Sequence, residues 1–229
     1  MSKQSRILLY TTLLVGLMAL PAISKADDII YSNLGSPPSY DCCYGYTESG
    51  SLSREGAVLS AMGFTNNTGQ NEDLTQIDLA DGFVSGTNSM TLDLYTDVGG
   101  VPGTLLGSWT VTGLPTFGSS NTELDTVTGI TGIVLQTGAT YFLAPTVPDS
   151  STWEAWNLNS NGQSGPYAWY DYTNNAWASC ASCTLNPNGA FDVYGTATAS
   201  PTPEPSAALL LGTLVGMFAA LRMRLRRLF

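Results

Sequence analysis

The sequence predicts an all-β protein whose body is an antiparallel β-sandwich of the jelly-roll type. Short apolar or alternating runs recur about every dozen residues, each bounded by Gly, Pro, Asn or Asp, and none has the pattern of a helix. Charged residues make up only 11% of the chain. Tyr, Trp, Ser, Thr and Asn take their place, which is typical of β-rich proteins rather than helical ones. A closed barrel is the alternative fold.

The first half of the body contains five predicted strands, at residues 29–33, 57–65, 74–84, 89–96 and 105–112. The fourth has the clearest pattern. In the stretch SMTLDLYTD, Met, Leu and Leu alternate with Thr, Asp and Tyr, and this period of two indicates a half-buried strand. The following DVGGVPGTL predicts a turn, because its glycines allow positive φ and its proline fixes φ.

The second half contains five more predicted strands, at residues 133–136, 140–147, 153–159, 167–172 and 190–195. They are runs of the same kind, separated by turn-forming residues. Ten strands without a repeat of fixed period favour a single sandwich domain over an array of repeated units.

The chain divides into four predicted segments. Residues 1–26 form a signal peptide, residues 27–196 the β-domain, residues 197–202 a linker and residues 203–229 a C-terminal tail. The β-domain is long enough for a core of its own. The linker consists of Thr, Ala, Ser and Pro, a composition that favours an extended spacer.

The N-terminal segment has the features of a secretory signal peptide. Lys3 and Arg6 precede an apolar run at residues 7–20, and Ser24 and Ala26 occupy the small-residue positions of a cleavage site. An N-terminal membrane anchor is the weaker alternative, because this run is shorter than the roughly 20 residues that cross a bilayer. We expect signal peptidase to remove the segment after Ala26.

The C-terminal tail predicts a short membrane helix. Residues 207–221 carry no charge and are rich in Leu, Ala and Gly. The positive cluster that follows would hold this end on the cytoplasmic side of the inner membrane. A buried core helix is disfavoured because the run has no polar face. The cluster consists of Arg222, Arg224, Arg226 and Arg227.

The same tail resembles the PEP-CTERM sorting signal of Gram-negative bacteria. Pro203, Glu204 and Pro205 precede the apolar run and the arginines, and this order of three parts carries the resemblance. It implies that the protein is a substrate of exosortase, a membrane-bound cysteine transpeptidase that cuts near the motif. It also implies transient anchoring in the inner membrane, followed by delivery to the cell surface or extracellular matrix.

The β-domain resembles the choice-of-anchor R family of secreted bacterial proteins. The stretches TQIDLADGFVSGTNSMTLDLYTDVGGVPGTLLGSWTVTGLP, TWEAWNLNS and GAFDVYG carry this resemblance, which extends over most of residues 27–195. It implies an exported β-domain, and it assigns no activity and no catalytic residue.

The charge of the domain excludes anionic partners. Residues 27–200 contain 17 acidic residues and one basic residue, Arg54, so that the net charge of the segment is −16. Such a surface repels nucleic acid and anionic lipid.

Four cysteines, in two pairs, predict disulfides in an exported protein. Adjacent Cys42 and Cys43 rarely bond to each other, so we favour two cross-links that join them to Cys180 and Cys183. A local Cys180–Cys183 bond is the alternative. A zinc site or a thioredoxin-like redox site is disfavoured, since the first pair lacks C-x-x-C spacing and the second lies in no βαβ pattern.

The chain contains no histidine, which excludes the Ser-His-Asp and Cys-His nucleophile systems and histidine metal sites. Paired carboxylates of a glycoside hydrolase remain the enzymatic alternative, with Asp149, Glu154 and Asp171 as candidates near tryptophans. Asp81 and Asp97 are candidates for a structural calcium ion, although turn-forming Asp is the more ordinary explanation. We expect no other cofactor.

An aromatic-rich stretch, TWEAWNLNSNGQSGPYAWYDYTNNAW, predicts either core packing or a sugar-binding surface. Exposed rings beside amides and acids hold sugar rings in lectin-like modules. A sandwich sends about half of such rings inward, and we assign Trp153 and Trp169 to the core. The candidates for glycan contact are Trp156, Tyr170, Tyr172 and Trp177.

These features together predict a non-enzymatic, exported protein with a structural or adhesive role, associated with extracellular polysaccharide or biofilm matrix. A glycan-binding or glycan-hydrolysing domain is the alternative. A plain membrane-anchored protein that keeps its tail is the third hypothesis.

Overall fold

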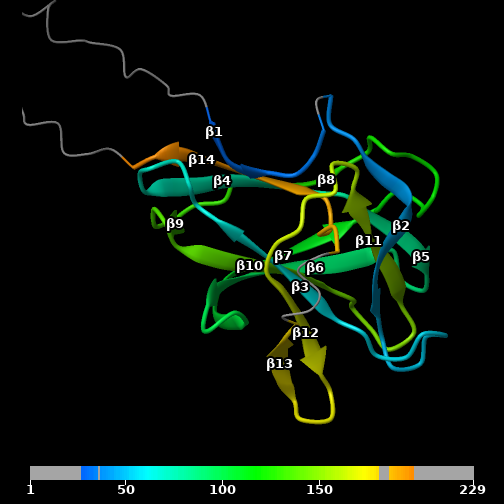
Figure 1. Ribbon diagram of the computed structural model, residues 1–229. Helices are drawn as coiled ribbons and strands as arrows, with labels where there is room; N and C mark the ends of the chain where they lie inside the picture. The colour runs from blue at the N-terminus through cyan, green and yellow to red at the C-terminus, as the bar shows by residue number, and fades with distance from the viewer. Residues whose placement is uncertain (1–26, 36, 181–185, 199–229) are drawn as a thin grey trace, which may run out of the picture.

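The computed structural model describes residues 27–35, 37–180 and 186–198. These residues form fourteen β-strands and no helix, and all pairs of the strands are antiparallel. The all-β antiparallel prediction is confirmed. The arrangement of the sheets is consistent with a β-sandwich (Figure 1).

The first sheet has β14 (Phe191–Ala197) and β4 (Glu72–Leu79) at its centre. β1 (Asp28–Ser32) pairs with the outer side of β14. The outer side of β4 pairs with β8 (Asp125–Thr128) and, further along, with β9 (Val134–Leu135). The first and last described strands are therefore direct neighbours.

The second sheet has six strands, one of which, β6 (Ser89–Asp97), shows the burial pattern that the sequence predicts. Residues of β6 alternate as the sequence predicts, because Met90, Leu92 and Leu94 are fully buried while the side chains between them are half-buried. In spatial order the strands are β13 (Ala176–Ser179), β12 (Tyr167–Asp171), β3 (Ser60–Thr65), β10 (Thr140–Thr146), β6 (Ser89–Asp97) and β7 (Pro102–Thr112).

The third sheet is small and has β11 (Trp153–Asn159) between β2 (Tyr40–Ser49) and β5 (Asp81–Ser85). It lies at one end of the other two sheets, on the right of Figure 1. Trp156 of β11 packs against the main core from this end.

The main core lies between the first and second sheets. Its members are apolar side chains that alternate with polar ones along β3, β4, β6 and β14, as expected for strands that bury one face. The largest of its fully buried side chains are Trp156, Phe64, Phe191, Met62, Leu74, Ile77, Leu79, Met90, Leu92, Leu94 and Leu135.

The predicted strand at residues 74–84 is two strands. β4 ends at Leu79 in the first sheet, and β5 begins at Asp81 in the third. Ala80 between them is fully buried, and its carbonyl accepts hydrogen bonds from the backbone and side-chain nitrogens of Asn157. The chain thus changes sheets without a turn-forming residue, which is why the sequence pattern shows no break.

Three strands were not predicted. β2 contains Cys, Gly and polar residues and has no sustained alternation, whereas β8 and β13 have only four residues each. The predicted strand at 57–65 begins three residues later, and the one at 133–136 shortens to β9.

The described part of the chain contains no helix long and apolar enough to cross a membrane. The predicted signal peptide, most of the linker and the whole predicted C-terminal tail lie outside the described residues.

Candidate functional site

The β12–β13 hairpin projects from the end of the second sheet (Figure 1), and it carries the exposed aromatic side chains of Trp169 and Tyr172. β12 pairs with β3 only from Tyr167 to Trp169, so the rest of the hairpin extends beyond the sheet. The carboxylate of Asp171 accepts hydrogen bonds from the backbone nitrogens of Thr173 and Asn174. These bonds close the turn, and the pKa of Asp171 is lowered chiefly by a further hydrogen bond, which the Asn174 side-chain amide donates to Oδ2 at 2.6 Å.

Four rings form a continuous row, three of them on one face of this hairpin and the fourth on β6 of the same sheet, and we call it the aromatic row. Tyr170 and Trp177 are a cross-strand pair with ring centroids 5.4 Å apart at 82°. Tyr172 meets Tyr170 edge to face at 5.0 Å, and Tyr95 of β6 meets Trp177 at 6.2 Å. Such edge-to-face contacts hold rings in fixed orientations.

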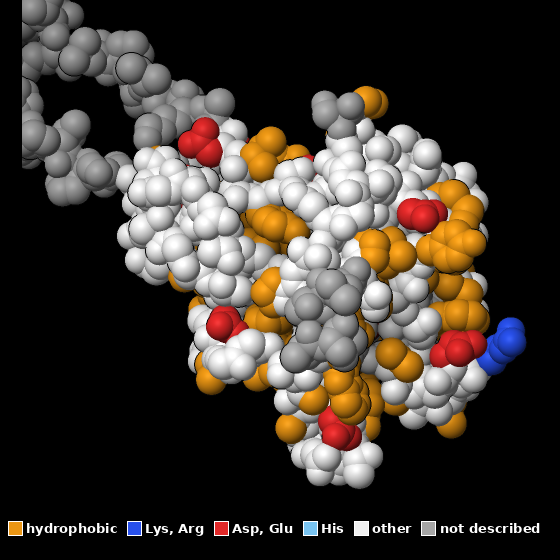
Figure 2. All heavy atoms as spheres, viewed as in Figure 1, with side chains coloured by type: hydrophobic (Ala, Val, Ile, Leu, Met, Phe, Trp, Pro, Cys, Tyr) orange, Lys and Arg blue, Asp and Glu red, His pale blue; other side chains and the backbone are white. Residues whose placement is uncertain are grey.

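The aromatic row is anchored below and open at its tip. Tyr95 and Trp177 pack on a small buried cluster that includes Phe142. Tyr172 at the tip is 51% exposed, and Tyr170 and Trp177 are partly exposed. Hydrophobic side chains gather over the hairpin at the bottom of Figure 2. Three of the four predicted glycan-contact residues therefore lie together on one surface.

Polar groups accompany these rings. The Tyr170 hydroxyl donates to Oδ1 of Asn175 at 2.8 Å, and the Tyr95 hydroxyl donates to Oδ2 of Asp93 at 3.1 Å. Burial and the nearby Asp93 carboxylate raise the pKa of Tyr95 to about 12, so its phenol stays neutral and can donate. Ring faces beside hydroxyls, an amide and a carboxylate are the groups that recognise sugars.

The fourth predicted contact residue, Trp156, is a core residue, and its assignment to a glycan surface is wrong. Its side chain is fully buried, its Nε1 donates to the carbonyl of Ala190 at 3.1 Å, and its ring packs on Phe191. Gly189 lies against the indole, where a Cβ would be only 2.5 Å from ring atoms. Conversely, Trp169 was assigned to the core but is 42% exposed on the opposite face of the hairpin.

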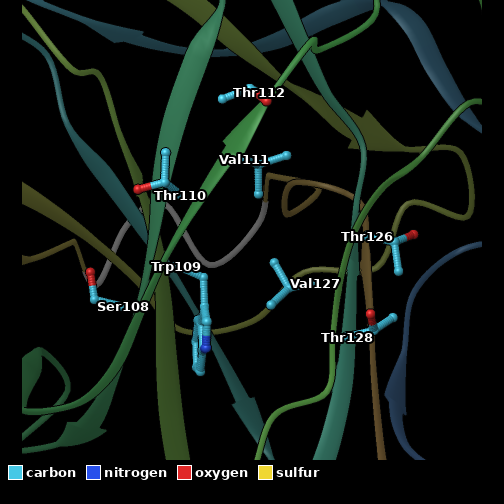
Figure 3. Close-up of a pocket in the computed structure, with 8 residues that line it drawn as sticks. All are labelled: Ser108, Trp109, Thr110, Val111, Thr112, Thr126, Val127 and Thr128. Atoms are coloured by element: carbon cyan, nitrogen blue, oxygen red, sulfur yellow. The ribbon is translucent and has the colours of Figure 1, made fainter.

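A second concave surface lies between the free edges of β7 and β8 (Figure 3). This cleft has a volume of about 590 Å³, and its lining contains no charged side chain among the described residues. Trp109, Val111 and Val127 point into the space between the strands, whereas Thr110 and Thr126 point away from it. The sequence prediction missed Trp109. Its only signal is the alternation SWTVT, which any half-buried strand shows.

The three hydrolase candidates do not form an accessible carboxylate pair. Asp149 accepts hydrogen bonds from Thr87 Oγ1 at 2.7 Å and from the Ser151 nitrogen at 2.8 Å, which lower its pKa. It lies in the turn before β11, whereas Asp171 closes the tip of the β12–β13 hairpin. Glu154, between them in sequence, is fully buried.

Glu154 belongs to a buried acidic cluster, formed with Glu48 and Asp81 on the inner face of the third sheet. Glu154 is the cross-strand partner of Glu48, and Asp81 pairs with the residue two positions after Glu154. All three are fully buried. Neither carboxylate oxygen of Glu154 has a hydrogen-bond partner in the described chain.

Burial makes these carboxyls weak acids. It raises the pKa of Glu154 to about 9 and that of Asp81 to about 8, with neighbouring carboxylates adding to the shift. The pKa of Glu48 is also raised well above its usual range by burial, although its Oε2 accepts a hydrogen bond from the Ser60 nitrogen at 2.9 Å. The cluster is therefore largely protonated at neutral pH.

The calcium candidates have ordinary structural contacts. Asp81 Oδ1 accepts from the backbone nitrogen of Gly82 at 2.8 Å, and Asp97 Oδ1 accepts from that of Gly100 at 2.8 Å. Within the described ranges, no group of three or more Asp, Glu or Cys side chains is placed to hold a metal ion. Calcium binding by either residue stays a prediction.

The favoured disulfide pairing is wrong for the first cysteine pair. Cys42 and Cys43 are free thiols on β2, Cys43 being exposed. A bond from either of them to the second pair is therefore not formed. Cys183 lies outside the described residues, so the alternative Cys180–Cys183 bond stays a prediction.

The predicted sorting residues Pro203, Glu204 and Pro205, together with the four tail arginines, also lie outside the described residues. The chain matches no family model, and no curated protein or solved structure is significantly similar to it.

Proposed function

We propose that this protein is a non-enzymatic, exported component of the cell surface or extracellular matrix that binds polysaccharide through the aromatic row. The single observation that carries the binding role is the grouping of Tyr170, Tyr172 and Trp177 on a projecting hairpin, with Tyr95 of β6 against Trp177. Rings that are packed together on one side and exposed on the other present rigid faces to sugar C–H groups at little entropic cost.

The chemistry of the domain supports a neutral or cationic glycan rather than an anionic one. Arg54 is the single basic residue of residues 27–200, which contain 17 acidic residues. The absence of an accessible carboxylate pair among Asp149, Glu154 and Asp171 favours binding over hydrolysis.

The export route is part of the same proposal and depends on the two ends of the sequence. We propose cleavage by signal peptidase, transient retention in the inner membrane and processing by exosortase at the PEP motif. The choice-of-anchor R resemblance and a jelly-roll topology for the sandwich belong to this proposal as well. Intact-mass measurement of the mature protein tests processing, since an unprocessed chain keeps Arg222 and the residues after it.

Glycan-array binding of the purified protein tests the aromatic row. We expect binding to at least one neutral or cationic polysaccharide, and Tyr172→Ala or Trp177→Ala should weaken it about tenfold, which corresponds to roughly 1.4 kcal/mol. Tyr44→Ala is the matched control, because Tyr44 is 68% exposed on β2, outside the row. Binding that depends equally on Tyr44, or no binding to any glycan, would contradict the proposal.

A further inference from the structure

Asn175 is the last residue of the turn that joins β12 to β13. Its φ is 53°, and among the residues that the structure describes it is the single non-glycine residue with a positive φ. Glycine adopts this backbone conformation at the lowest cost, and hairpin loops commonly place glycine at such a position. The chain therefore keeps a side chain where glycine would allow the same turn.

The Asn175 side chain is held beside the aromatic row. The Tyr170 hydroxyl donates a hydrogen bond to Oδ1 of Asn175 at 2.8 Å, and this bond leaves Nδ2 free. Nδ2 has two N–H donors and makes no hydrogen bond with any described residue. Because Asn175 is exposed, these donors reach solvent next to the Tyr170 ring.

The Tyr172 hydroxyl is a second free donor at this exposed end of the row. Its ring meets that of Tyr170 at 5.0 Å, and none of the described residues hydrogen-bonds to the hydroxyl. The carboxylate of Asp171 points to the other face of the hairpin, because it follows Tyr170 in the strand. Its oxygens already accept three hydrogen bonds within the turn, one of them from the Asn174 amide.

The other carboxylate of the row lies at the opposite end. Asp93 accepts the hydroxyl of Tyr95, and the ring of Tyr95 contacts Trp177 rather than Tyr170 or Tyr172. A ligand stacked on the exposed end therefore meets hydrogen-bond donors first.

We propose that this exposed end recognises acetylated amino sugars, with the Asn175 amide donating to the acetamido carbonyl, an inference that rests on the proposed glycan-binding function. The carbonyl oxygen is an acceptor for the free N–H groups, and the acetyl methyl group adds apolar contact with the rings of Tyr170 and Tyr172. An ammonium group at the same place has donors only, so it would face the amide donors without forming a bond.

The charge of the domain acts in the opposite direction, because an acidic protein attracts a cationic, deacetylated glycan from a distance. Salt separates the two effects. At about 0.5 M sodium chloride the Debye length is only about 4 Å, so the long-range attraction is screened, whereas a direct hydrogen bond to Asn175 persists.

Titration calorimetry at this salt concentration, with three oligosaccharides of equal length and linkage, tests the inference. They are a chito-oligosaccharide with acetamido groups, its deacetylated form with ammonium groups, and a cello-oligosaccharide with hydroxyl groups. We expect the protein to bind the acetylated form at least about fivefold more tightly than either of the others.

Failure of the inference differs from failure of the proposed function. If the ammonium or hydroxyl form bound as tightly as the acetylated form, the inference would be overturned and glycan binding would stand. If no oligosaccharide and no glycan on the array bound, both would be rejected together.

Two substitutions of Asn175 test the role of its amide. Asn175→Gly suits the positive φ and removes the donors, so it should weaken binding of the acetylated form about three- to tenfold. Asn175→Asp keeps the acceptor for Tyr170 but replaces the donors with a negative oxygen, so the preference should reverse in favour of the ammonium form. Asn67→Asp, at an exposed residue between β3 and β4, is the matched control and should leave the preference unchanged.

A purely structural role of Asn175 has a different expected outcome. If its side chain served only to hold Tyr170 and the turn, Asn175→Asp would preserve both functions and the preference for the acetylated form. That result, or an equal effect of Asn67→Asp, would reject recognition by the Asn175 amide.

Discussion

At the scale of single residues, the buried acidic cluster is the least ordinary feature of this molecule. Glu48, Asp81 and Glu154 sit beside one another without a cation, although burying a carboxylate in this way is costly. The protein tolerates the cluster by keeping it protonated. This makes its stability depend on pH in a direction opposite to that of an ordinary salt-bridged carboxylate.

Stability should fall as pH rises through the neutral range. The pKa of Glu154 increases from 4.5 when unfolded to about 9 when folded, and that of Asp81 from 3.8 to about 8. Between these values the folded state binds more protons than the unfolded state, so the free energy of unfolding decreases with increasing pH. Urea denaturation at pH 5, 7 and 9 checks this, and Asp125, whose pKa burial raises to about 7, contributes in the same direction.

Glu154→Gln isolates the effect of one cluster member. A neutral amide has nearly the shape of the protonated acid, so the variant should match the unaltered protein at pH 5. At pH 9 it should be more stable by on the order of 2 kcal/mol, because it removes a buried charge. Asp149→Asn serves as the control, since Asp149 is exposed and its pKa is lowered rather than raised. A pH profile unchanged by Glu154→Gln would contradict this account.

Trp156 is the residue whose loss should cost most. Its ring fills the space between Gly189 and Phe191 at the end of the main core. Trp156→Ala should reduce the free energy of unfolding by about 3–5 kcal/mol, as is typical of large-to-small core substitutions. Chemical denaturation measures this, and Trp169→Ala, at a half-exposed indole, should cost much less. If both variants lost the same free energy of unfolding, the difference in burial between the two rings would be contradicted.

At the scale of elements, local pattern predicts a strand well where the strand keeps one face in the core. β6 follows its pattern because it pairs with β10 on one side and β7 on the other, and because its apolar residues face the main core. β2 escapes prediction because a bulge at Cys42 and Cys43 interrupts its alternation. The sequence around Ala80 does not show that residues 74–84 form two strands. The sheet that a strand joins depends on partners far away in the chain.

The candidate site was predictable to the extent that it is local. Tyr170, Tyr172 and Trp177 lie in one hairpin, so their spacing alone brings them together. Tyr95 on β6 contacts Trp177 although the two residues are far apart in the sequence, so no local pattern predicts this contact. Trp169 shares its face of β12 with Tyr167, which packs against the main core, yet Trp169 is 42% exposed. The alternation alone does not distinguish the two positions.

The free edge of β7 predicts self-association. β7 is eleven residues long, has no charged side chain and pairs on one side only among the described strands. Natural edge strands usually carry a Lys or another device that prevents edge-to-edge pairing. Thr110→Lys, at an exposed position, should lower self-association at high concentration and change stability by less than about 0.5 kcal/mol. Sedimentation at increasing protein concentration measures the self-association. Thr91→Lys is the control, because β6 is paired on both sides. If the two variants reduced self-association equally, pairing through the edge of β7 would be contradicted.

At the scale of the whole molecule, nearly all charged residues of the domain are acidic. Within residues 27–200 Arg54 is the only basic residue against 17 acidic ones, three of which, Glu48, Asp81 and Glu154, are largely protonated. Its contact with Glu55, 3.7 Å and exposed, contributes little. Repulsion among the remaining carboxylates therefore acts against the compact state, and salt weakens that repulsion.

Raising sodium chloride from about 0.01 M to about 0.5 M at pH 7 should accordingly stabilise the protein by roughly 1 kcal/mol. The urea midpoint is the measurement. Potassium chloride should act alike, because the effect depends on ionic strength and not on a bound ion. A midpoint that is constant or falls with salt would show that repulsion is minor.

The pairing of β1 with β14 also determines how the domain responds to tension. The two strands are antiparallel neighbours, with Asp28 opposite Gly195, so both ends of the domain leave from the same place. A force that pulls these ends apart would break the hydrogen bonds between them one after another, as a zipper opens. Force spectroscopy through the two ends should therefore show peeling of β1 at low force, before the remaining strands yield together.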